Sequence, residues 1–403
     1  MPSSSIQSAV MPVELAPDGR PERHGTPLRV LQVYKSWVPE TYGGVEQTIT
    51  TIGTGAQAYG ITSRVLFLGA GTAVRRVRYR GLQGFRFPLD LTLASTGISL
   101  SLPLAYRRLA DWADIVHFHF PWPYGDLVHL LTGAGKPLIV TYHLDITRQR
   151  LLRWLYAPIM RRFLRGADLI VATSANMVQT SAALRPLRHK TTVIPLGIED
   201  VHGAAAVPLR TALWRQRLGE GFVLFVGVLR HYKGLQYLLE AAPAIHGRIV
   251  IAGTGPCARA LREQAAGAQL SNVTFLGAVD DLDKHALYHL CQVFAFPSHL
   301  RSEGYGLALV EAAMHGKPMV SCEIGTGTSF VNQHGETGYV VEPRRPDAFA
   351  EAVNRLLLNS EERERLGRNA RARYSARFTA PAMTAAYAEA YRQVLVRRGR
   401  CPS

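Results

Sequence analysis

The sequence is poor in cysteine, with only four in 403 residues, at positions 257, 291, 322 and 401. They are widely spaced and form no C-x-x-C pair, which excludes a disulfide framework and a cysteine-based zinc site and indicates a reducing compartment. The chain also lacks any apolar run of the about 18 to 20 residues that a membrane-spanning helix needs. No internal repeat of fixed period occurs.

Acidic residues are also scarce relative to basic ones: 30 against 46 give a formal net charge of +16. Such a balance indicates an anionic partner, which could be nucleic acid, phospholipid or a phosphorylated substrate. Residues 1–26 are rich in Ser and Pro and lack the basic start and apolar core of a secretory signal. We expect them to form a disordered arm.

What the chain does have is two sets of short apolar runs separated by helical patterns. The first set is 28–34, 63–68, 115–119, 137–142, 169–172 and 192–194, and the second is 222–226, 248–252, 273–276, 293–296, 318–321 and 338–341. Strands that alternate with helices indicate parallel βαβ units. We therefore predict two Rossmann-like domains, 27–199 and 200–380, whose ligands bind beyond the carboxyl ends of the strands.

The segment RSEGYGLALVEAAMHGKPMV, residues 301–320, places two carboxylates around the start of a predicted helix. Free amides at a helix start carry partial positive charge and suit a phosphate or pyrophosphate. Glu303 lies just outside this helix, and Glu311 lies about two turns inside it, where it could accept hydrogen bonds from a vicinal diol. A sugar–diphosphate–ribose ligand has this layout. The alternative is an amphipathic helix with two solvated acids.

The pair Glu303 and Glu311, continued by AAMHGKPMV, resembles the E-x7-E motif of retaining GT-B glycosyltransferases. The resemblance implies an α/β fold of two Rossmann-like domains whose parallel sheets face an interdomain cleft, with a C-terminal helix, 381–398, that packs back on the N-terminal domain. It places Glu303 beside the donor sugar and Glu311 on the nucleotide ribose. The amides near the helix start would stabilise the leaving diphosphate, namely those of Gly304, Tyr305, Gly306 and Leu307.

Gly43 and Gly44 follow the first predicted strand and precede a helix. Two glycines let the backbone approach a phosphate closely, although a tight strand-to-helix turn has the same composition. The pair resembles the GG loop of the family, where the donor phosphates and the acceptor meet.

His117 and His119 end another predicted strand, and alternation places both on one face. Such a pair can bind zinc, but no third ligand is evident and a structural role is the alternative. The stretch resembles the family's D-x-V-H-x-H strand, whose histidine lies close to the reacting sugar. We favour His119 as the residue nearest the reaction, with His117 as the alternative.

The segment VGVLRHYKGL opens the second domain and supplies two cations, Arg230 and Lys233. Cations after a strand end can neutralise a leaving diphosphate, although loop cations are usually only solvated. The family commonly has G-R-x-x-x-x-K-G here. Lys233 matches that pattern, whereas Val228 stands in place of the arginine, for which Arg230 could substitute.

Two further loops concern the nucleotide base. Gly253 opens a G-x-G-P sequence that resembles the family's loop beside the base, although the bare G-x-G also fits a simple turn. Val279 falls where the family's backbone contacts the base, and Asp280 could accept hydrogen bonds from guanine or be a solvated loop acid.

One helical stretch has arginines at positions 150, 153, 161 and 165 and an apolar stripe with Trp154 beside it. A basic amphipathic helix with aromatic residues can lie on an anionic membrane. The alternative is an ordinary core-facing helix with a charged outer face.

The resemblance covers nearly all of the chain after Thr26 and implies transfer of a hexose from a nucleotide diphosphate sugar to a glycan hydroxyl. The family works with retention and with neither metal nor cofactor, and we find no D-x-D pair near the motifs above. VYKSWVPETYGGVEQ and GVLRHYKGL resemble mannosyl- and rhamnosyltransferases of bacterial O-antigen assembly. This favours GDP-mannose or GDP-rhamnose over a UDP-sugar, a glycan or lipid-linked oligosaccharide acceptor, and a cytoplasmic protein in peripheral contact with the anionic inner-membrane leaflet.

Two alternatives belong to other classes. A nucleotide-sugar epimerase would use the same nucleotide site without an acceptor. A nucleic-acid-binding protein is suggested by charge alone, since the sequence has no helix-turn-helix pattern, RNA-binding aromatic motif or zinc ligands.

Overall fold

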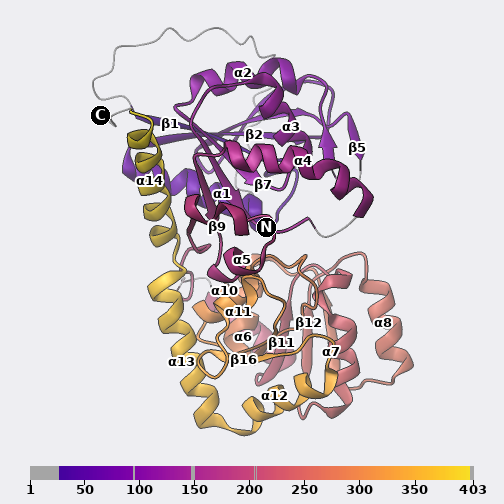
Figure 1. Cartoon of the computed structure of the whole chain (residues 1–403). Coiled ribbons are helices and arrows are strands. Elements are labelled where there is room, and N and C mark those ends of the chain that lie inside the picture. Colours follow the sequence, from indigo (N-terminus) through magenta and orange to yellow (C-terminus); the bar gives the residue numbers. More distant parts are fainter. Residues whose placement is uncertain (1–26, 94–95, 147–149, 204, 206, 400–403) are drawn as a thin grey trace. The chain divides into compact units, whose positions relative to one another are not determined.

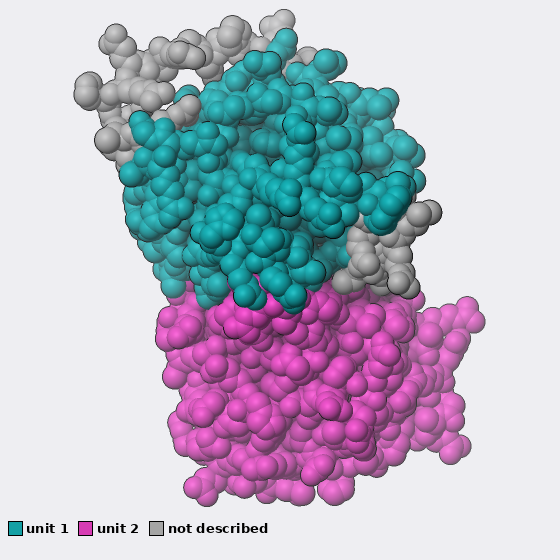
Figure 2. Space-filling model, viewed as in Figure 1, with its two compact units in different colours: residues 1–173, 181–195, 380–403 teal, residues 174–180, 196–379 magenta. Residues whose placement is uncertain are grey.

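The computed structural model describes residues 27–93, 96–146, 150–203, 205 and 207–399. The predicted disordered arm, residues 1–26, lies outside them. The chain forms two compact units, shown in Figures 1 and 2. Of the described residues, unit 1 comprises those within 1–173, 181–195 and 380–403, and unit 2 comprises those within 174–180 and 196–379. No helix in the described part is long and apolar enough to cross a membrane.

Unit 1 is built on one large sheet and a small hairpin. Its strands are β1 Leu28–Val33, β2 Ile61–Gly69, β3 Arg75–Tyr79, β4 Leu82–Pro88, β5 Leu91–Leu93, β6 Thr96–Ile98, β7 Ile115–Phe120, β8 Leu138–Tyr142, β9 Leu169–Ala172 and β10 Thr191–Val193. The large sheet has the order β10-β9-β8-β7-β1-β2-β4-β3, and only the β3–β4 pair is antiparallel. The other two strands, β5 and β6, pair with each other.

The helices of unit 1 cover this sheet. They are α1 Gly44–Gly55, α2 Leu102–Trp112, α3 Pro123–Thr132, α4 Arg150–Gly166 and α14 Ala380–Arg397, with short 3-10 turns η1 Ala56–Tyr59 and η2 Arg185–Lys190. Central strands are buried on both faces, which explains their nearly continuous apolar sequences, such as LIVTY in β8. The last helix, α14, packs against α1.

The six strands predicted from the first set of apolar runs are confirmed, but the β3–β4 hairpin was missed. Strand β3 reads RRVRY and offers a single aliphatic residue, so its sequence resembles a charged loop. The hairpin depends on Arg80 and Gly81, whose φ values of 47° and 82° fit the two-residue turn that antiparallel strands favour.

Unit 2 has a six-stranded, fully parallel sheet with the order β13-β12-β11-β14-β15-β16. Its strands are β11 Phe222–Val226, β12 Ile249–Ala252, β13 Val273–Gly277, β14 Cys291–Phe296, β15 Met319–Cys322 and β16 Gly338–Val341. All six were predicted. Its helices are α5 Ala175–Thr180, α6 Val207–Leu218, α7 Leu235–Ala241, α8 Ala258–Gly267, α9 Asp281–Leu290, α10 Leu307–Met314, α11 Thr328–Val331, α12 Pro346–Leu358 and α13 Ser360–Arg377, with 3-10 turns η3 His231–Lys233 and η4 Ala242–Ala244.

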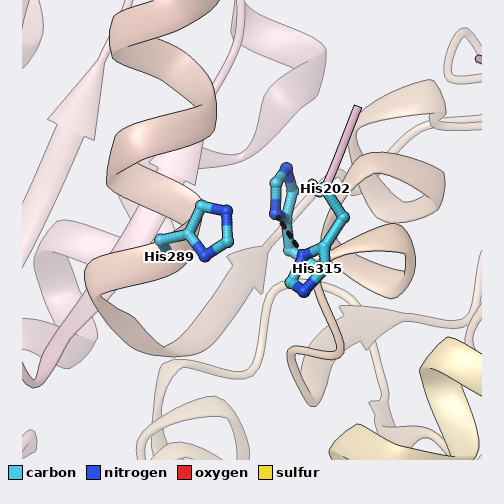
Figure 3. A group of neighbouring side chains, drawn as sticks. All are labelled: His202, His289 and His315. Carbon is cyan, nitrogen blue, oxygen red and sulfur yellow. Dashed lines mark hydrogen bonds between the residues drawn. The ribbon is translucent and has the colours of Figure 1, made fainter. Parts of the chain in front are cut away.

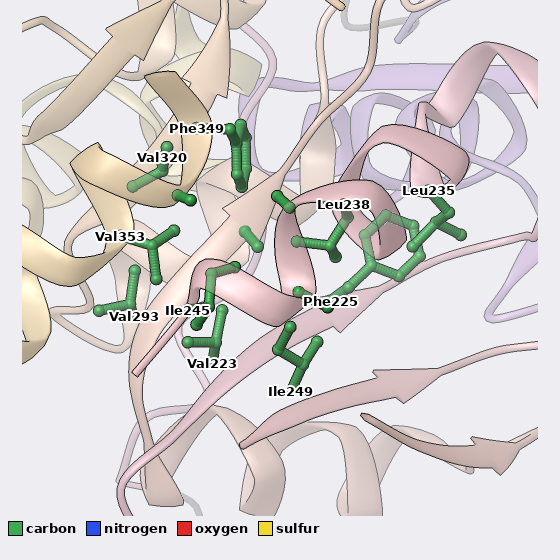
Figure 4. Packing of buried hydrophobic residues seen from close by; sticks show 14 of the residues in the cluster. Val223, Phe225, Leu235, Leu238, Ile245, Ile249, Val293, Val320, Phe349 and Val353 are labelled. Carbon is green, nitrogen blue, oxygen red and sulfur yellow. The ribbon is translucent and has the colours of Figure 1, made fainter. Parts of the chain in front are cut away.

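The core of unit 2 lies between this sheet and the helices α7 and α12 (Figure 4). Val223 and Val293 from the sheet pack with Leu238 of α7 and Val353 of α12, and each is fully buried. Burying such side chains contributes roughly 1.5–3 kcal/mol each. This core fixes the strand ends from which the loops of the site emerge.

In both sheets the strand order reverses beside the first strand of the unit. The reversal lies between β1 and β7 in unit 1 and between β11 and β14 in unit 2. Ligands of doubly wound α/β sheets bind outside the carboxyl ends of the strands at such switch points. Gly43 follows β1, His119 lies near the end of β7, Lys233 follows β11 and Glu303 follows β14, so these four predicted residues lie at the switch point of their own unit.

Candidate active site

A largely buried ion pair joins the loops after β11 and β14. The Nζ of Lys233 donates a hydrogen bond to Oε2 of Glu303, and the hydroxyl of Ser298 donates to the same oxygen at 3.2 Å. The Lys233 ammonium also lies 4.8 Å from the centre of the Phe296 ring. Two residues predicted independently, from motifs 70 positions apart, are thus brought together.

Two glycines allow loops that follow β11, β12 and β14 to meet backbone to backbone. Gly234 has φ 74°, and a Cβ there would lie 1.9 Å from the carbonyl oxygen of Pro297. Gly253 has φ 140°, and a Cβ there would lie 2.0 Å from the carbonyl oxygen of Gly227. Only glycine fits both positions. The predicted Gly253 therefore has a packing role, whether or not it also contacts a base.

The helix α10 begins as the sequence predicted. Its N-cap is Gly306, with φ 86°, and no side chain caps its first amides. Tyr305 is buried just before it, where its hydroxyl donates to the carbonyl oxygen of Leu196 at 3.3 Å and burial raises its pKa. Gly304 is also buried and accepts a hydrogen bond from the amide of Gly327. The uncapped start at Leu307 leaves amides of the kind that bind anions.

Glu311 lies inside α10 and is nearly buried. The Nζ of Lys284 donates to its Oε1 at 2.7 Å, and the hydroxyl of Tyr288 donates to its Oε2 at 3.2 Å. Burial acts to lower the pKa of Lys284, but Glu311 and Asp281 outweigh it, so the pKa is raised and the ammonium stays charged. Sequence reasoning missed Lys284 and Tyr288, although their i, i+4 spacing places them on one face of α9.

The remaining predicted residues of unit 2 lie in loops. Val279 precedes α9 and is half-buried. Its neighbour Asp280 caps α9 by accepting a hydrogen bond from the amide of Asp283 at 2.7 Å. This structural role as a helix cap is neither of the two that the sequence suggested for Asp280, and a contact with guanine stays a prediction. Arg230 is exposed, and its side chain has no hydrogen-bond or ion-pair partner among the described residues.

A D-x-D pair does occur near these motifs, so its expected absence was wrong. Asp281 and Asp283 open α9 only two residues after Val279. Asp281 pairs with Lys284 at 3.0 Å, and Asp283 accepts from Arg210 at 3.2 Å and from the Trp214 indole at 2.9 Å. Both carboxylates thus already have cationic partners.

At the switch point of unit 1, α1 begins at Gly44 with Gly43 as its N-cap, and no side chain caps it. Both glycines are exposed. A Cβ on Gly43 would lie 2.6 Å from Oε2 of Glu46, whose other oxygen, Oε1, accepts hydrogen bonds from the hydroxyls of Ser36 and Thr41 at 2.7 Å each. The loop is therefore shaped around an ordered carboxylate, and no side chain caps the helix start that follows it.

The two histidines of β7 share one face, as predicted, and their ring centres are 4.4 Å apart. Both are fully buried. His117 pairs with Tyr391 at 2.8 Å and Thr141 at 2.7 Å, and His119 pairs with His143 at 3.0 Å and Gln32 at 3.1 Å. Burial lowers the pKa of His117 to about 3 and that of His119 well below its usual value, so both are neutral.

Every ring nitrogen of this pair is thus engaged inside unit 1. A sugar could contact His117 or His119 directly only if one of these hydrogen bonds broke. The surroundings support the structural alternative, and a contact between His119 and the reacting sugar stays a prediction.

Comparison with known proteins shows the family to which the chain belongs. Residues 42–202 match Glycosyltransferase Family 4, and residues 214–373 match Glycosyl transferases group 1. The D-rhamnosyltransferase WbpZ of Pseudomonas aeruginosa is 50% identical over 353 residues, which are 88% of this chain and 93% of that protein. O-antigen chain mannosyltransferase C of Escherichia coli is 41% identical over 368 residues, covering 91% and 99%.

Among solved structures, Anabaena HepE in complex with UDP and glucose aligns with a TM-score of 0.72 at 20% identity, covering 90% of this chain and 99% of that one. This likeness shows the fold alone and confirms the predicted GT-B class, an α/β fold with two Rossmann-like domains. The two sequence relatives show more than the fold, because their identity extends over nearly the whole chain. The protein belongs to the group 1 glycosyltransferase family and is an enzyme of that class.

Proposed function

We propose that the protein transfers mannose or rhamnose from its GDP-activated form to a glycan or lipid-linked oligosaccharide in the assembly of an O-antigen polysaccharide. The observation that carries this proposal is the 50% identity to the D-rhamnosyltransferase over 88% of the chain. The second relative is named a mannosyltransferase. D-Rhamnose is 6-deoxy-D-mannose, so the two names agree on the stereochemistry of the ring and differ only at C6.

The site of unit 2 supports a way of binding such a donor. Lys233 and the uncapped amides at Leu307 would hold the diphosphate, and their fixed positive charge would stabilise the charge that develops as the sugar leaves. Glu303, which is held against Lys233, would accept hydrogen bonds from sugar hydroxyls at the junction of sugar and phosphate. Glu311 would accept hydrogen bonds from the ribose diol. The diol would then share the carboxylate with Lys284 and Tyr288.

We infer retention of configuration and no requirement for a divalent ion in the reaction. The inference rests on the family motif and on the cations of the site, since Lys233 and the α10 amides supply the positive charge that a metal supplies elsewhere. Adding Mg²⁺ or Mn²⁺ should change kcat less than twofold. A strict dependence on either ion would contradict the inference.

A donor panel tests the proposal directly. The purified protein is given GDP-mannose, GDP-rhamnose or UDP-glucose with a synthetic oligosaccharide acceptor, and the product is measured by mass spectrometry and its anomeric configuration by NMR. We expect at least tenfold higher kcat/KM for a GDP-sugar and a product of the donor's own configuration. Preference for UDP-glucose would overturn the donor, and conversion of the donor without acceptor would instead favour an epimerase.

We also infer peripheral contact with an anionic membrane on its cytoplasmic side. Leu104 of α2, Leu131 of α3 and Trp154 of α4 are each more than 70% exposed, on helices that pack side by side, and Arg161 is exposed on α4. The second half of α4 packs into the core through Phe163, while the side chains of the predicted Arg150 and Arg153 lie outside the described residues.

Vesicle flotation tests this contact. We expect flotation with vesicles that contain phosphatidylglycerol and loss of it with neutral vesicles or high salt. Joint substitution Leu104→Ala and Trp154→Ala should reduce it, while Leu358→Ala, an equally exposed change in unit 2, should not. Equal flotation of all three proteins would contradict the inference.

A further inference from the structure

Three histidines from separate parts of unit 2 converge at one point (Figure 3). His202 lies in the segment before α6, His289 in the last turn of α9, and His315 at the C-cap of α10. Each offers one ring nitrogen, and these atoms all lie within 4.8 Å of one another. The Nδ1 atoms of His202 and His315 are 3.2 Å apart, and the rings of His202 and His289 stack with centres 4.8 Å apart.

Among the described residues, one buried atom of this cluster lacks a hydrogen bond of ordinary geometry, although the His202 backbone lies near its ring. The Nε2 of His289 is buried and has no hydrogen-bond partner of ordinary geometry in the described part of the chain. A buried polar atom without a partner costs free energy, so it needs a cause. A metal ion bound by this nitrogen would supply one. In a tetrahedral zinc site the ligand nitrogens are about 3.3 Å apart, close to the 3.2 Å between the Nδ1 atoms of His202 and His315.

An outer hydrogen bond already orients His315 for this role. Its Nε2 lies 2.9 Å from Nδ1 of His285. If Nε2 carries the proton and donates it to His285, Nδ1 is left with its lone pair directed toward His202. A metal-ligating histidine usually donates its other ring N–H in this way. The ring of His315 also stacks on Tyr288, with centres 5.4 Å apart, which fixes its plane.

The donor atoms of the cluster decide which ion it could take. His315 is buried and His289 is half-buried, and neutral imidazole nitrogens of this kind are common metal ligands. Lys317 and Arg371 lie nearby, although Arg371 is paired with Asp200 at 2.6 Å. Imidazole ligands suit an ion held by strong bonds to nitrogen, such as Zn²⁺ or Ni²⁺, and not Mg²⁺ or Ca²⁺, which prefer oxygen.

We propose that unit 2 holds one Zn²⁺-type ion on His202, His289 and His315, with water as the fourth ligand. A surface hollow lined by His202, His315, Glu364 and Arg368 gives the ion and its water access from solvent. The ion would tie the segment at His202 to α9 and α10. Because α10 carries Glu311 four residues before His315, the ion would also fix the helix that bears this residue of the candidate active site.

The test is zinc binding by the full-length protein without an affinity tag, measured by competition with a chromogenic chelator and by thermal unfolding. We expect one Zn²⁺ per chain and a rise of Tm with Zn²⁺, since a ligand bound only by the folded state stabilises it. His202→Ala, an exposed change that should fold, and His289→Ala should each weaken binding at least tenfold and abolish the rise.

His246→Ala is the matched control, because His246 is an exposed histidine of the same unit outside the cluster. It should bind Zn²⁺ as the unmodified protein does. Co²⁺ gives a second reading: its visible absorption bands should appear in the control and be absent from His202→Ala. Stoichiometric binding that survives both cluster substitutions, or no stoichiometric binding by the unmodified protein, would overturn the proposal.

Discussion

Lys233 and Glu303 illustrate what a single side chain contributes at this site. Their ion pair is mostly shielded from water, so among the described residues removal of the lysine leaves the Glu303 carboxylate with only the hydroxyl of Ser298 as a partner. We predict that Lys233→Ala lowers kcat about 100-fold or more, which is the usual effect of losing one donor to a developing negative charge. Steady-state kinetics measure this. Arg259→Ala, a change at a highly exposed cation of unit 2, should leave kcat unchanged, and an equal loss in both variants would contradict the assignment.

Glu311 allows a separate prediction about binding. Its carboxylate oxygens face Lys284 and Tyr288, and a ribose diol would add a charge-assisted hydrogen bond. Such bonds are worth about 1.5–3 kcal/mol, so Glu311→Ala should raise the Kd for GDP at least tenfold. Calorimetric titration checks this, with Glu263→Ala on the surface of α8 as control. Unchanged affinity would remove Glu311 from the nucleotide site.

At the scale of residues, the sequence offered candidates for the site but not the partners that the fold gives them. Glu303, Glu311 and Lys233 belong to continuous motifs, so their spacing was visible. The Lys284–Glu311 contact joins positions 27 residues apart with no motif at the lysine. The histidines of β7 show the opposite difficulty: alternation predicted their common face, but only the packed fold reveals that each nitrogen already has a partner.

Among the elements, the loop between β11 and α7 depends on one glycine. Gly234→Ala would combine a strained φ of 74° with a backbone clash at 1.9 Å, whereas Gly277→Ala has a similar φ of 79° and open space around its Cβ. Strain alone costs about 1–3 kcal/mol. We predict that Gly234→Ala lowers Tm by several degrees more than Gly277→Ala in thermal unfolding. Equal losses would mean that the close approach to Pro297 relaxes freely.

Two strands show why apolar sequence patterns predict some strands and miss others. Strand β14 could be found because it is buried on both faces and therefore reads as a nearly pure apolar run. The β3–β4 hairpin could not, because β3 lies at the sheet edge and tolerates arginines at positions 75, 76 and 78. Its register depends on the turn at Arg80 and Gly81, where both residues have positive φ. An arginine in the sequence does not predict such a turn.

The buried histidines in β7 and directly after β8 predict that the folded state loses stability in acid. Burial lowers the pKa values of His117 and His143 to about 3, against about 6.5 in the unfolded chain. Between these values the unfolded state binds more protons, so stability is present above pH 6.5 and falls as the pH falls. Each histidine should cost about 1.5 kcal/mol between pH 6.5 and pH 5. In urea unfolding, His143→Gln should flatten this dependence, and parallel curves would contradict it.

For the whole molecule, the chain path matters as much as the two sheets. Unit 1 is not a continuous segment: it takes in residues 181–195 and the final helix α14. The apolar runs predict two sheets of parallel strands, yet periodicity alone does not say that a helix following unit 2 belongs to unit 1. That placement came from family resemblance, and side-chain contacts explain it: Tyr387 and Tyr391 reach buried partners on β8 and β7.

Removal of residues 380–403 should therefore unfold unit 1 and spare unit 2. The deletion strips the hydroxyls of Tyr387 and Tyr391 from Thr141 and His117 at 2.8 Å each and exposes the apolar surface under α14. Each buried polar group left unpaired costs about 1–3 kcal/mol, and the lost burial adds to this. Limited proteolysis should leave a protected fragment that begins near residue 196. Tyr391→Phe, which removes one hydroxyl and keeps the ring, should only lower Tm. If the truncated chain yielded protected fragments from both units, α14 would be dispensable for folding and the contacts at Tyr387 and Tyr391 would contribute little.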